Sequence, residues 1–388
     1  MNRIIVTIVF CIGWMVCSAQ TKPVAVGAEA TNEYFPLLKG KRIAVLSNHT
    51  GMVGNEHLVD LLKRKDFNVV CIFSPEHGFR GNADAGEHVS SSMDEKTGIP
   101  ILSLYDGDTG KPSVKSMSLF DVLVFDLQDV GLRFYTYYAT MVRMMDACAE
   151  SQKKMIILDR PNPNGHYVDG PILDMKYKSG VGWLPIPVVH GMTLGELAMM
   201  VNGEKWLPEG RICDISVIKC KNYTHQTMYQ LPIPPSPNLP TMKAVYMYPS
   251  TCYFEATPVS LGRGTDKPFL VYGHPNMLSY SFSFTPRSIP GAKNPPQLNK
   301  ICYGVDLSNL SDSDIWKKGV DLTYLIDAYT NLNMGDHFFS SFFEKLIGVS
   351  YVRKMIKEGC SADEIKKKWS DDVEKFKKQR APYLLYQE

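Results

Sequence analysis

Ionisable and hydrogen-bonding side chains gather directly behind four short apolar runs of this sequence. They are Asn48, His49, Glu76, His77, Arg80, Asp126, Asp129, Arg133, Asp159, Arg160 and Asn162. Carboxyl groups and histidines are the usual proton donors and acceptors of catalysis, and arginine binds carboxylates. Any one of these residues has a structural interpretation as a charge in a loop. Their occurrence behind four runs favours one polar site with acid–base chemistry.

The apolar runs have the composition of buried strands. They are continuous, rich in Val, Ile and Leu, and lie at residues 42–47, 68–74, 100–104, 121–126 and 155–159. Segments with apolar residues at helical spacing lie between these runs, for example at residues 56–65 and 137–153. Alternating strands and helices predict a doubly wound α/β domain with a parallel sheet. Ligands of such sheets bind at the carboxyl ends of the strands, where the polar residues stand.

The pattern changes in the second half of the chain. Residues 231–240 (LPIPPSPNLP) hold five prolines and cannot form a helix or a central strand. We expect one domain over residues 20–245 and a smaller C-terminal α+β domain over residues 246–388. Helices are expected at 322–332 and 338–347, and a last one from the capping box Ser361-x-x-Glu364 to about Arg380.

The first residues have the pattern of an export signal. Arg3 precedes an apolar run over residues 4–17, and small residues follow it. The run is short for a membrane span but typical of a signal-peptide core. We predict a signal peptide over residues 1–19, cleaved before Gln20, and an exported, periplasmic protein. Since no later run reaches the length of a span, no integral membrane segment is expected after cleavage.

Several function classes lack their sequence signals. Lys plus Arg is 42 against 40 for Asp plus Glu, and no basic stripe is visible, so nucleic acid is not an expected partner. The loop at residues 48–54 (NHTGMVG) has neither glycine-rich nucleotide cradle, and no G-x-S-x-G elbow occurs. We expect no cofactor.

A metal site is the alternative that these residues leave open. Six potential ligands could converge: His49, Glu76, His77, Asp126, Asp159 and His190. However, no H-E-x-x-H spacing is present, and neighbours such as Glu76 and His77 rarely point the same way. We expect no bound metal.

Longer blocks of sequence carry a resemblance to a known family. They are NHTG (48–51), SPEHGFRG (74–81), VFDLQDVG (124–131), RFYTY (133–137), LDRPNP (158–163), PVVHGMT (187–193), PSPNLPT (235–241) and GRGT (262–265). In this order they resemble the signature blocks of the NamZ-type exo-β-N-acetylmuramidases, over nearly all of the chain. Ala256 and Pro258 depart from the glycine and asparagine of that pattern.

The resemblance implies a secreted glycosidase of peptidoglycan. Members of the family remove N-acetylmuramic acid from non-reducing ends of glycan chains, with a cleft between a Rossmann-like domain and a smaller C-terminal domain. Their proposed catalytic glutamate lies in the block that contains Glu76 here. Peptidoglycan-derived saccharides are therefore the expected partners.

Physical chemistry agrees with a catalytic Glu76. Glycosidic cleavage needs a protonated acid at the leaving oxygen, usually with a second carboxylate. Glu76 follows an apolar strand, and partial desolvation would raise its pKa. Asp126, Asp129, Asp159 and Glu255 all qualify by type as the second group, and we favour Asp126 and Asp159. Retaining, inverting and acetamido-assisted mechanisms remain open.

The lactyl carboxylate of muramic acid calls for a cation. Arg80, Arg133, Arg160 and Arg263 are the candidates, and a planar guanidinium suits a carboxylate better than lysine does. Arg80 and Arg263 rank first, because Arg133 and Arg160 have aspartates nearby as partners. The other predicted substrate contacts are Asn48, His49, His77, Asp129, Asn162, His190 and Glu255.

Two rival functions follow from the same residues. A non-catalytic cell-wall sugar-binding protein would agree with the departures at Ala256 and Pro258, and it would release no sugar. A metal-dependent hydrolase would lose its activity to a chelator.

Overall fold

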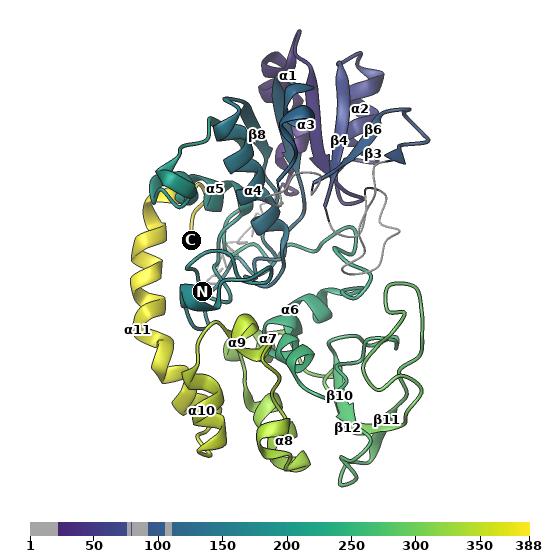
Figure 1. Ribbon diagram of the computed structural model, residues 1–388, viewed down its shortest axis with the longest axis vertical. Helices are drawn as coiled ribbons and strands as arrows, with labels where there is room; N and C mark the ends of the chain where they lie inside the picture. Colours follow the sequence, from purple (N-terminus) through teal and green to yellow (C-terminus); the bar gives the residue numbers. More distant parts are fainter. Residues whose placement is uncertain (1–21, 76–78, 80–91, 105–110) are drawn as a thin grey trace, which may run out of the picture.

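The computed structural model describes residues 22–75, 79, 92–104 and 111–388. The predicted signal peptide over residues 1–19 and three predicted site residues, Glu76, His77 and Arg80, lie outside the described residues. A large sheet with its helices occupies the upper part of Figure 1 and a smaller antiparallel sheet with short helices the lower part. The predicted α/β fold with a smaller α+β region is confirmed.

In the described residues the large sheet has seven strands in the order β5-β6-β4-β1-β7-β8-β9. Their bounds are β1 (Ile43–Ser47), β4 (Val69–Ser74), β5 (Ser92–Met93), β6 (Pro100–Ser103), β7 (Val122–Asp126), β8 (Lys154–Leu158) and β9 (Ile215–Ile218). All pairs are parallel except β5 with β6. The five predicted runs are all strands. The pattern missed β5 and β9, which are the short edge strands.

Burial on both faces explains why the central strands are continuously apolar. Along β1, Ala44 and Leu46 belong to one core cluster, whereas Ile43 and Val45 belong to the other. Alternate side chains of a strand point to opposite faces, so each face needs its own covering layer. A sequence that is apolar at every position satisfies both layers.

Helices supply these layers on the two faces. They are α1 (Thr31–Leu38), α2 (Leu58–Arg64), α3 (Val114–Ser118), α4 (Tyr137–Glu150) and α5 (Leu194–Gly203). Buried residues of α1 and α2 join one core cluster, and those of α3, α4 and α5 join the other. The sheet is thus doubly wound, as predicted. A small ribbon of β2 (Met52–Val53) and β3 (Glu56–His57) precedes α2.

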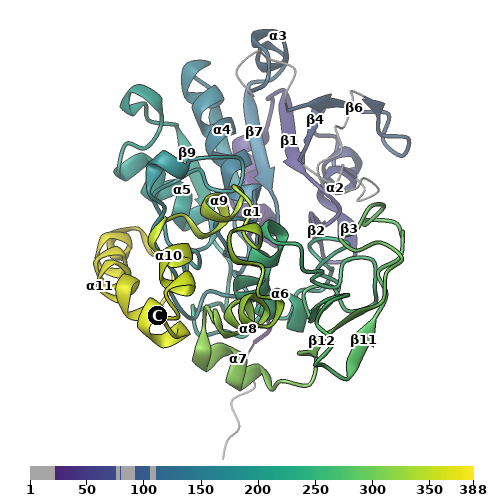
Figure 2. The same cartoon turned by 60° about the horizontal axis from the view of Figure 1, so that its bottom comes forward.

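The lower part begins with α6 (Met242–Thr251). Its antiparallel sheet has the order β10-β12-β11, formed by β10 (Val271–His274), β11 (Phe282–Phe284) and β12 (Cys302–Asp306), and Figure 2 shows β11 and β12 side by side. The following helices are α7 (Asp312–Lys318), α8 (Thr323–Leu332), α9 (Phe343–Ile347) and α10 (Tyr351–Lys357). The boundary predicted at residue 246 falls inside α6, and the division into domains stays a prediction.

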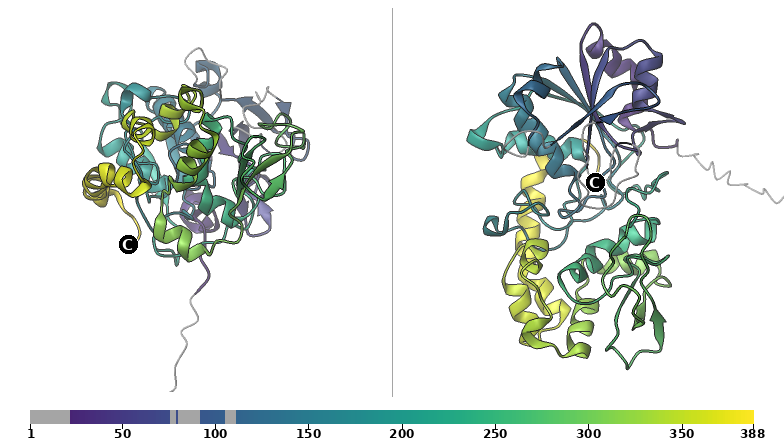
Figure 3. Two further views of the ribbon diagram at one scale, coloured as in Figure 1. Left: turned by 90° about the horizontal axis from the view of Figure 1, so that it is seen from below. Right: turned by 45° about the vertical axis from the view of Figure 1, so that its right-hand side comes forward.

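The last helix returns the chain to the large sheet. α11 (Ala362–Arg380) begins at the predicted capping box of Ser361 and Glu364 and runs beside both parts of the molecule in Figures 1 and 3. Beyond it, the Tyr386 hydroxyl donates a hydrogen bond of 2.7 Å to Oδ2 of Asp159 at the end of β8. Within the described ranges, no helix combines the length and the apolar character that a membrane crossing requires.

Candidate functional site

Polar residues do meet at the carboxyl ends of the parallel strands. Asn48 follows β1, Asp126 closes β7, and Asp159 and Arg160 follow β8. Because β1, β7 and β8 are neighbours, these residues share one edge of the sheet. All four side chains are buried. Their hydrogen bonds therefore decide which of them remains available for a substrate.

Asp126 and Arg160 form a bidentate ion pair. Arg160 Nε donates to Asp126 Oδ1 at 2.6 Å, and Nη2 donates to Oδ2 at 3.0 Å and to the Met52 carbonyl at 3.0 Å. The sequence predicted a nearby aspartate as the partner of Arg160, and this aspartate is found. Both oxygens of Asp126 are occupied, which favours a structural role. Its catalytic role stays an untested prediction.

Asp159 has a comparable set of local partners. Its Oδ1 accepts from the Gly195 amide at 2.9 Å, and its Oδ2 accepts from the hydroxyls of Thr193 and Tyr386, each at 2.7 Å. Burial raises the pKa of Asp159 to about 6, while these donors oppose the rise. The carboxyl group thus joins the start of α5 to the C-terminal tail. These contacts too favour a structural role.

Asp129 differs from both of them. Its Oδ1 accepts from the Gly131 amide at 2.6 Å, whereas its Oδ2 is buried and has no hydrogen-bond partner within the described part of the chain. Burial raises its pKa to about 7, although backbone amides lower it. A buried carboxyl group with one unused oxygen and a raised pKa has the properties of an acid–base group. Sequence reasoning placed Asp129 among the substrate contacts.

The Asp129 loop is fixed against the loop after β8. Gly131 has φ 77°, and a Cβ at this position would lie 2.2 Å from Oδ1 of Asn162. Asn162 in turn donates to the Met192 carbonyl at 2.9 Å. Gln128 Nε2 donates to the Pro161 carbonyl at 2.7 Å. Asn162 therefore packs against Gly131 of the Asp129 loop, and its amide nitrogen is used by the hydrogen bond to the Met192 carbonyl.

The residues after β1 contact the proline-rich segment. His49 Nε2 lies 2.9 Å from the Pro234 carbonyl, and the Tyr135 hydroxyl donates to the Pro235 carbonyl at 2.8 Å. Asn48 is buried, and its Nδ2 donates to the Tyr137 hydroxyl at 2.8 Å. The sequence identified this segment only by its unsuitability for helices and strands. Its position at the strand ends had no sequence signal.

Arg133 requires a correction. We expected an aspartate as its partner, but its two terminal nitrogens donate to four backbone carbonyls at 2.7–3.0 Å. These carbonyls belong to Pro171, Ile186, Leu346 and Ile347. The side chain is fully buried, and burial lowers its pKa to about 10. Arg133 joins loops of the upper part to the end of α9, which leaves no donor on its terminal nitrogens for a lactyl group.

His190 is a buried, neutral histidine. Its Nδ1 accepts from the Met192 amide at 3.2 Å. Burial, Arg380 and His225 together lower its pKa to about 3. No group of three or more His, Cys, Asp or Glu side chains in the described residues is arranged to hold a metal ion. His190 thus stabilises a loop here, and its predicted substrate contact stays untested.

Glu255 and Arg263 lie in the lower part of the molecule. Arg263 Nη2 donates to Glu255 Oε1 at 2.5 Å, and both side chains keep about a fifth of their surface exposed (22% and 23%). The guanidinium carbon of Arg263 lies 5.2 Å from the centre of the Phe269 ring. Burial by itself would lower the pKa of Arg263, but the Glu255 carboxylate has the opposite effect, and the pKa lies above its usual value. Because the bond to Glu255 uses one terminal nitrogen, Arg263 keeps donors for a ligand carboxylate.

The departure at Ala256 has little structural cost. Ala256 ends the 3-10 helix Cys252–Ala256, is buried, and does not adopt a positive φ. Its carbonyl accepts from the Ser340 amide at 2.8 Å.

Tyr135, Tyr137 and Tyr138 are also buried, so they belong to the core and not to an open sugar platform.

Comparison with known proteins identifies the family. The sequence model of the N-terminal domain of the exo-β-N-acetylmuramidase NamZ matches residues 43–243, and that of its C-terminal domain matches residues 246–386. The chain belongs to the NamZ family. Its predicted family and its predicted glycosidase class are confirmed by these matches.

Related proteins agree in sequence and in fold. The peptidoglycan β-N-acetylmuramidase NamZ of Bacillus subtilis (strain 168) is 39% identical over 374 residues, which cover 91% of this chain and 89% of that protein. A crystal structure of a DUF1343 family protein of Bacteroides fragilis NCTC 9343 is 71% identical, with a TM-score of 0.89 over 95% of this chain and 100% of that one. A second one from the same strain is 29% identical, with a TM-score of 0.78 over 94% and 99%.

Proposed function

We propose that the protein is an exo-acting glycoside hydrolase that releases N-acetylmuramic acid from the non-reducing ends of peptidoglycan fragments. The observation that carries this proposal is the match of both NamZ domains along the chain, over residues 43–243 and 246–386. The muramidase of Bacillus subtilis supports it, since the match covers nine-tenths of both chains. The residues that follow are proposed for this reaction.

Two carboxyl groups are needed for the cleavage, and Glu76 is the first that we propose. For the second, hydrogen bonding separates the four carboxyl groups that qualify by type. Arg160 occupies Asp126, three donors occupy Asp159, and Arg263 pairs with Glu255. Asp129 alone among these four has a buried oxygen without a partner in the described residues. We therefore propose Asp129 as the second carboxyl group.

The raised pKa of Asp129 gives it a definite task. With a pKa of about 7, its carboxyl group is protonated below neutral pH and can donate a proton or a hydrogen bond from Oδ2. The Gly131 amide fixes Oδ1, so the group has one defined orientation. In water an aspartic acid would have lost this proton. The protein thus holds beside the acid Glu76 a second carboxyl group that can gain or lose a proton near neutral pH.

The lactyl carboxylate is proposed to bind an arginine with free donors. Arg133 and Arg160 are excluded from this role by their own partners. Arg263 is half-buried and bonded to Glu255 through a single nitrogen, so it can donate to a second carboxylate. Arg80 is the other candidate. A charge-assisted pair would discriminate muramic acid from N-acetylglucosamine by about ten- to a hundredfold.

Export to the periplasm is also proposed. It is supported by Arg3, the apolar run over residues 4–17 and the small residues that follow. Fractionation of cells that express the full chain, with mass measurement of its N-terminus, tests this. A chain that begins at Gln20 in the periplasmic fraction is expected, and an intact N-terminus in the cytoplasm would contradict the proposal.

The exo mode is tested with glycan chains of defined ends. Two populations of peptide-free chains are prepared, one with muramic acid and one with N-acetylglucosamine at the non-reducing end. The proposal expects release of N-acetylmuramic acid from the first population only, one residue per chain when glucosamine follows. Fragments of intermediate length from either population would show internal cleavage instead.

A further inference from the structure

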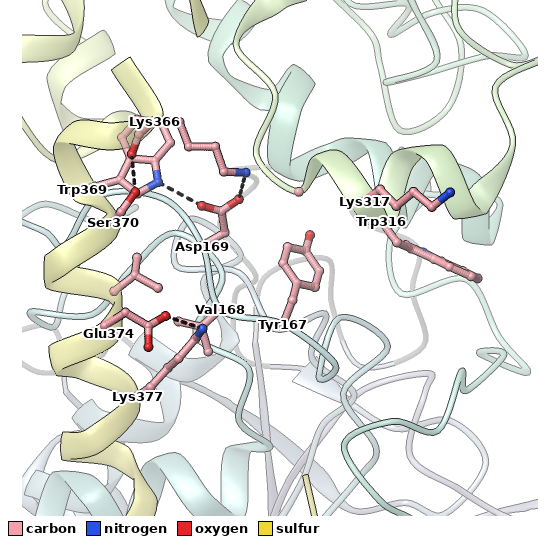
Figure 4. A pocket seen from close by; sticks show the side chains of 12 residues that line it. Tyr167, Val168, Asp169, Trp316, Lys317, Lys366, Trp369, Ser370, Glu374 and Lys377 are labelled. Carbon is pink, nitrogen blue, oxygen red and sulfur yellow. Dashed lines mark hydrogen bonds and ion pairs between the residues drawn. The ribbon is translucent and has the colours of Figure 1, made fainter. Parts of the chain in front are cut away.

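A pocket that none of the described candidate site residues lines lies where three parts of the chain meet. It has a volume of about 280 Å³, and Figure 4 shows that the residues lining it come from α11, from the loop before residue 170 and from the end of α7. Its lining residues include Tyr167, Asp169, Trp316, Lys317, Lys366 and Lys377. Sequence reasoning assigned no role to any of these residues.

One wall of the pocket is rigid and electrostatically satisfied. Asp169 accepts from Lys366 Nζ at 2.6 Å, from Trp369 Nε1 at 2.9 Å and from two backbone amides. Lys366 is also held by the Lys318 carbonyl at 2.6 Å. At Gly319 (φ 63°) a Cβ would lie 2.3 Å from Oδ2 of Asp169, so this position needs glycine. Asp169 therefore has no oxygen left for a ligand.

The polar groups that remain are all donors. Trp316 Nε1 is buried and has no hydrogen-bond partner in the described ranges. Over the same residues, neither the Tyr167 hydroxyl nor the Lys317 ammonium group makes a hydrogen bond or ion pair, and Lys317 is exposed. A buried donor without a partner, such as Trp316 Nε1, is costly, and an acceptor that enters the pocket would remove this cost.

Charge and shape restrict the class of ligand. Three lysines line the pocket against two acidic residues, and one of these, Glu374, pairs with Lys377 at 2.6 Å. This balance suits an anion. Tyr167 and Trp316 add aromatic rings, on which the apolar face of a sugar packs. The volume is close to the lower limit of about 300 Å³ for small-molecule sites, which suits one sugar residue.

We propose that this pocket is a second saccharide site, which binds a carboxylate-bearing sugar residue of the glycan without cleaving it. The proposal rests on the proposed function for its choice of polymer. Lys317 binds the carboxylate, Trp316 Nε1 and the Tyr167 hydroxyl donate to sugar oxygens, and the ring of Trp316 covers the apolar face. Such a site would hold a long chain on the enzyme while its non-reducing end is cleaved.

The test uses ¹⁹F NMR of protein labelled with 5-fluorotryptophan. The chain has five tryptophans, and Trp316→Phe identifies the resonance of Trp316. Free N-acetylmuramic acid is expected to shift that resonance in a saturable way, whereas N-acetylglucosamine and lactate, each lacking one half of the ligand, shift it less at equal concentration. An unmoved resonance, or equal shifts by all three compounds, would overturn the proposal.

A matched pair of lysine variants locates the binding. Lys317→Ala should weaken the affinity read at Trp316 about tenfold, the effect of one charge-assisted hydrogen bond. Lys39→Ala removes an exposed lysine at the far end of α1 and should leave it unchanged. An affinity unchanged by Lys317→Ala would place the sugar elsewhere and overturn the proposal.

The outcome is separable from that of the proposed function. Release of muramic acid from a disaccharide is measured on the same samples. Release without a shift of Trp316 would contradict the second site alone. A shift without release would support the site and contradict the hydrolase.

Discussion

Arg160 donates two hydrogen bonds to Asp126 across adjacent strands, at 2.6 and 3.0 Å, where both side chains are almost completely buried. The pair connects the ends of β7 and β8. Since Asp126 uses both oxygens on Arg160, we propose that acid–base chemistry at this edge belongs to other carboxyl groups.

Asp126→Asn should destabilise the protein strongly. The amide cannot neutralise Arg160, and an unpaired buried charge typically costs about 3–5 kcal/mol. Urea unfolding measures this difference. Asp372→Asn is the control, because Asp372 pairs with Lys375 on the exposed face of α11 and should cost less than about 1 kcal/mol. Equal losses in the two variants would contradict the role of the buried pair.

Asp129→Asn should lower kcat by about 10²-fold or more, since an amide cannot transfer a proton. It should also change how stability depends on pH. The folded pKa of Asp129, about 7, lies above its ordinary 3.8, so the folded state retains a proton that the unfolded state loses. This contribution to stability is present at acid pH and is lost as pH rises through about 7.

Thermal unfolding at about pH 4.5 and pH 8 checks the sign of this linkage. The wild type should lose more stability than Asp129→Asn between these two values. Parallel losses in the two proteins would show that the pKa of Asp129 is not raised. An Asp129→Asn variant that folds and keeps full turnover would remove Asp129 from the mechanism.

Glu76→Gln should lose about 10²–10⁴ in rate and keep its fold, because the amide has the shape of the acid but no proton to give. Glu358→Gln, at an exposed position after α10, is the matched control and should retain wild-type turnover. The comparison of kcat between these two folded variants is decisive. Equal turnover would exclude Glu76 as the catalytic acid.

Arg133→Lys should destabilise the protein without changing its choice of sugar. A single ammonium group cannot reach four carbonyls, so a loss on the order of 3 kcal/mol is expected. The readouts are urea unfolding and the ratio of kcat/KM for muramic-acid and N-acetylglucosamine substrates. A changed ratio at unchanged stability would assign Arg133 to the substrate instead.

Arg263→Ala should reduce the preference for muramic acid by about ten- to a hundredfold if it binds the lactyl carboxylate. Slow turnover of the neutral sugar should persist. Arg287→Ala is the control in the same part of the molecule, because the exposed side chain of Arg287 donates to Asn299 and not to a carboxylate. A preference that survives Arg263→Ala would shift the assignment to Arg80.

Sequence patterns predicted the central strands well and the contacts between loops poorly. The run that became β7 is apolar at each position because both its faces are buried, so its signal is strong. The strand β9 has three half-buried residues of four, and its signal is correspondingly weak. Helix starts with capping boxes, such as that of Ser361 and Glu364, were visible because the interaction is local.

Roles that depend on distant partners had no such signal. The partners of Arg133 are backbone carbonyls as far as 214 positions away in sequence, and any residue type supplies a carbonyl. Asp126, Asp129 and Asp159 look alike in sequence, and only their hydrogen bonds separate them. The pairing of Arg160 with an aspartate was predictable because charge complementarity is a property of residue types.

The most direct test of the central claim is mass analysis of the products from a disaccharide with N-acetylmuramic acid at its non-reducing end. The proposed hydrolase should release N-acetylmuramic acid and N-acetylglucosamine in equal amounts, before and after dialysis against a strong chelator, and Glu76→Gln should suppress this release. An intact disaccharide after prolonged incubation with the folded wild-type protein would contradict the assignment, and release that a chelator abolishes would indicate a metal-dependent hydrolase instead.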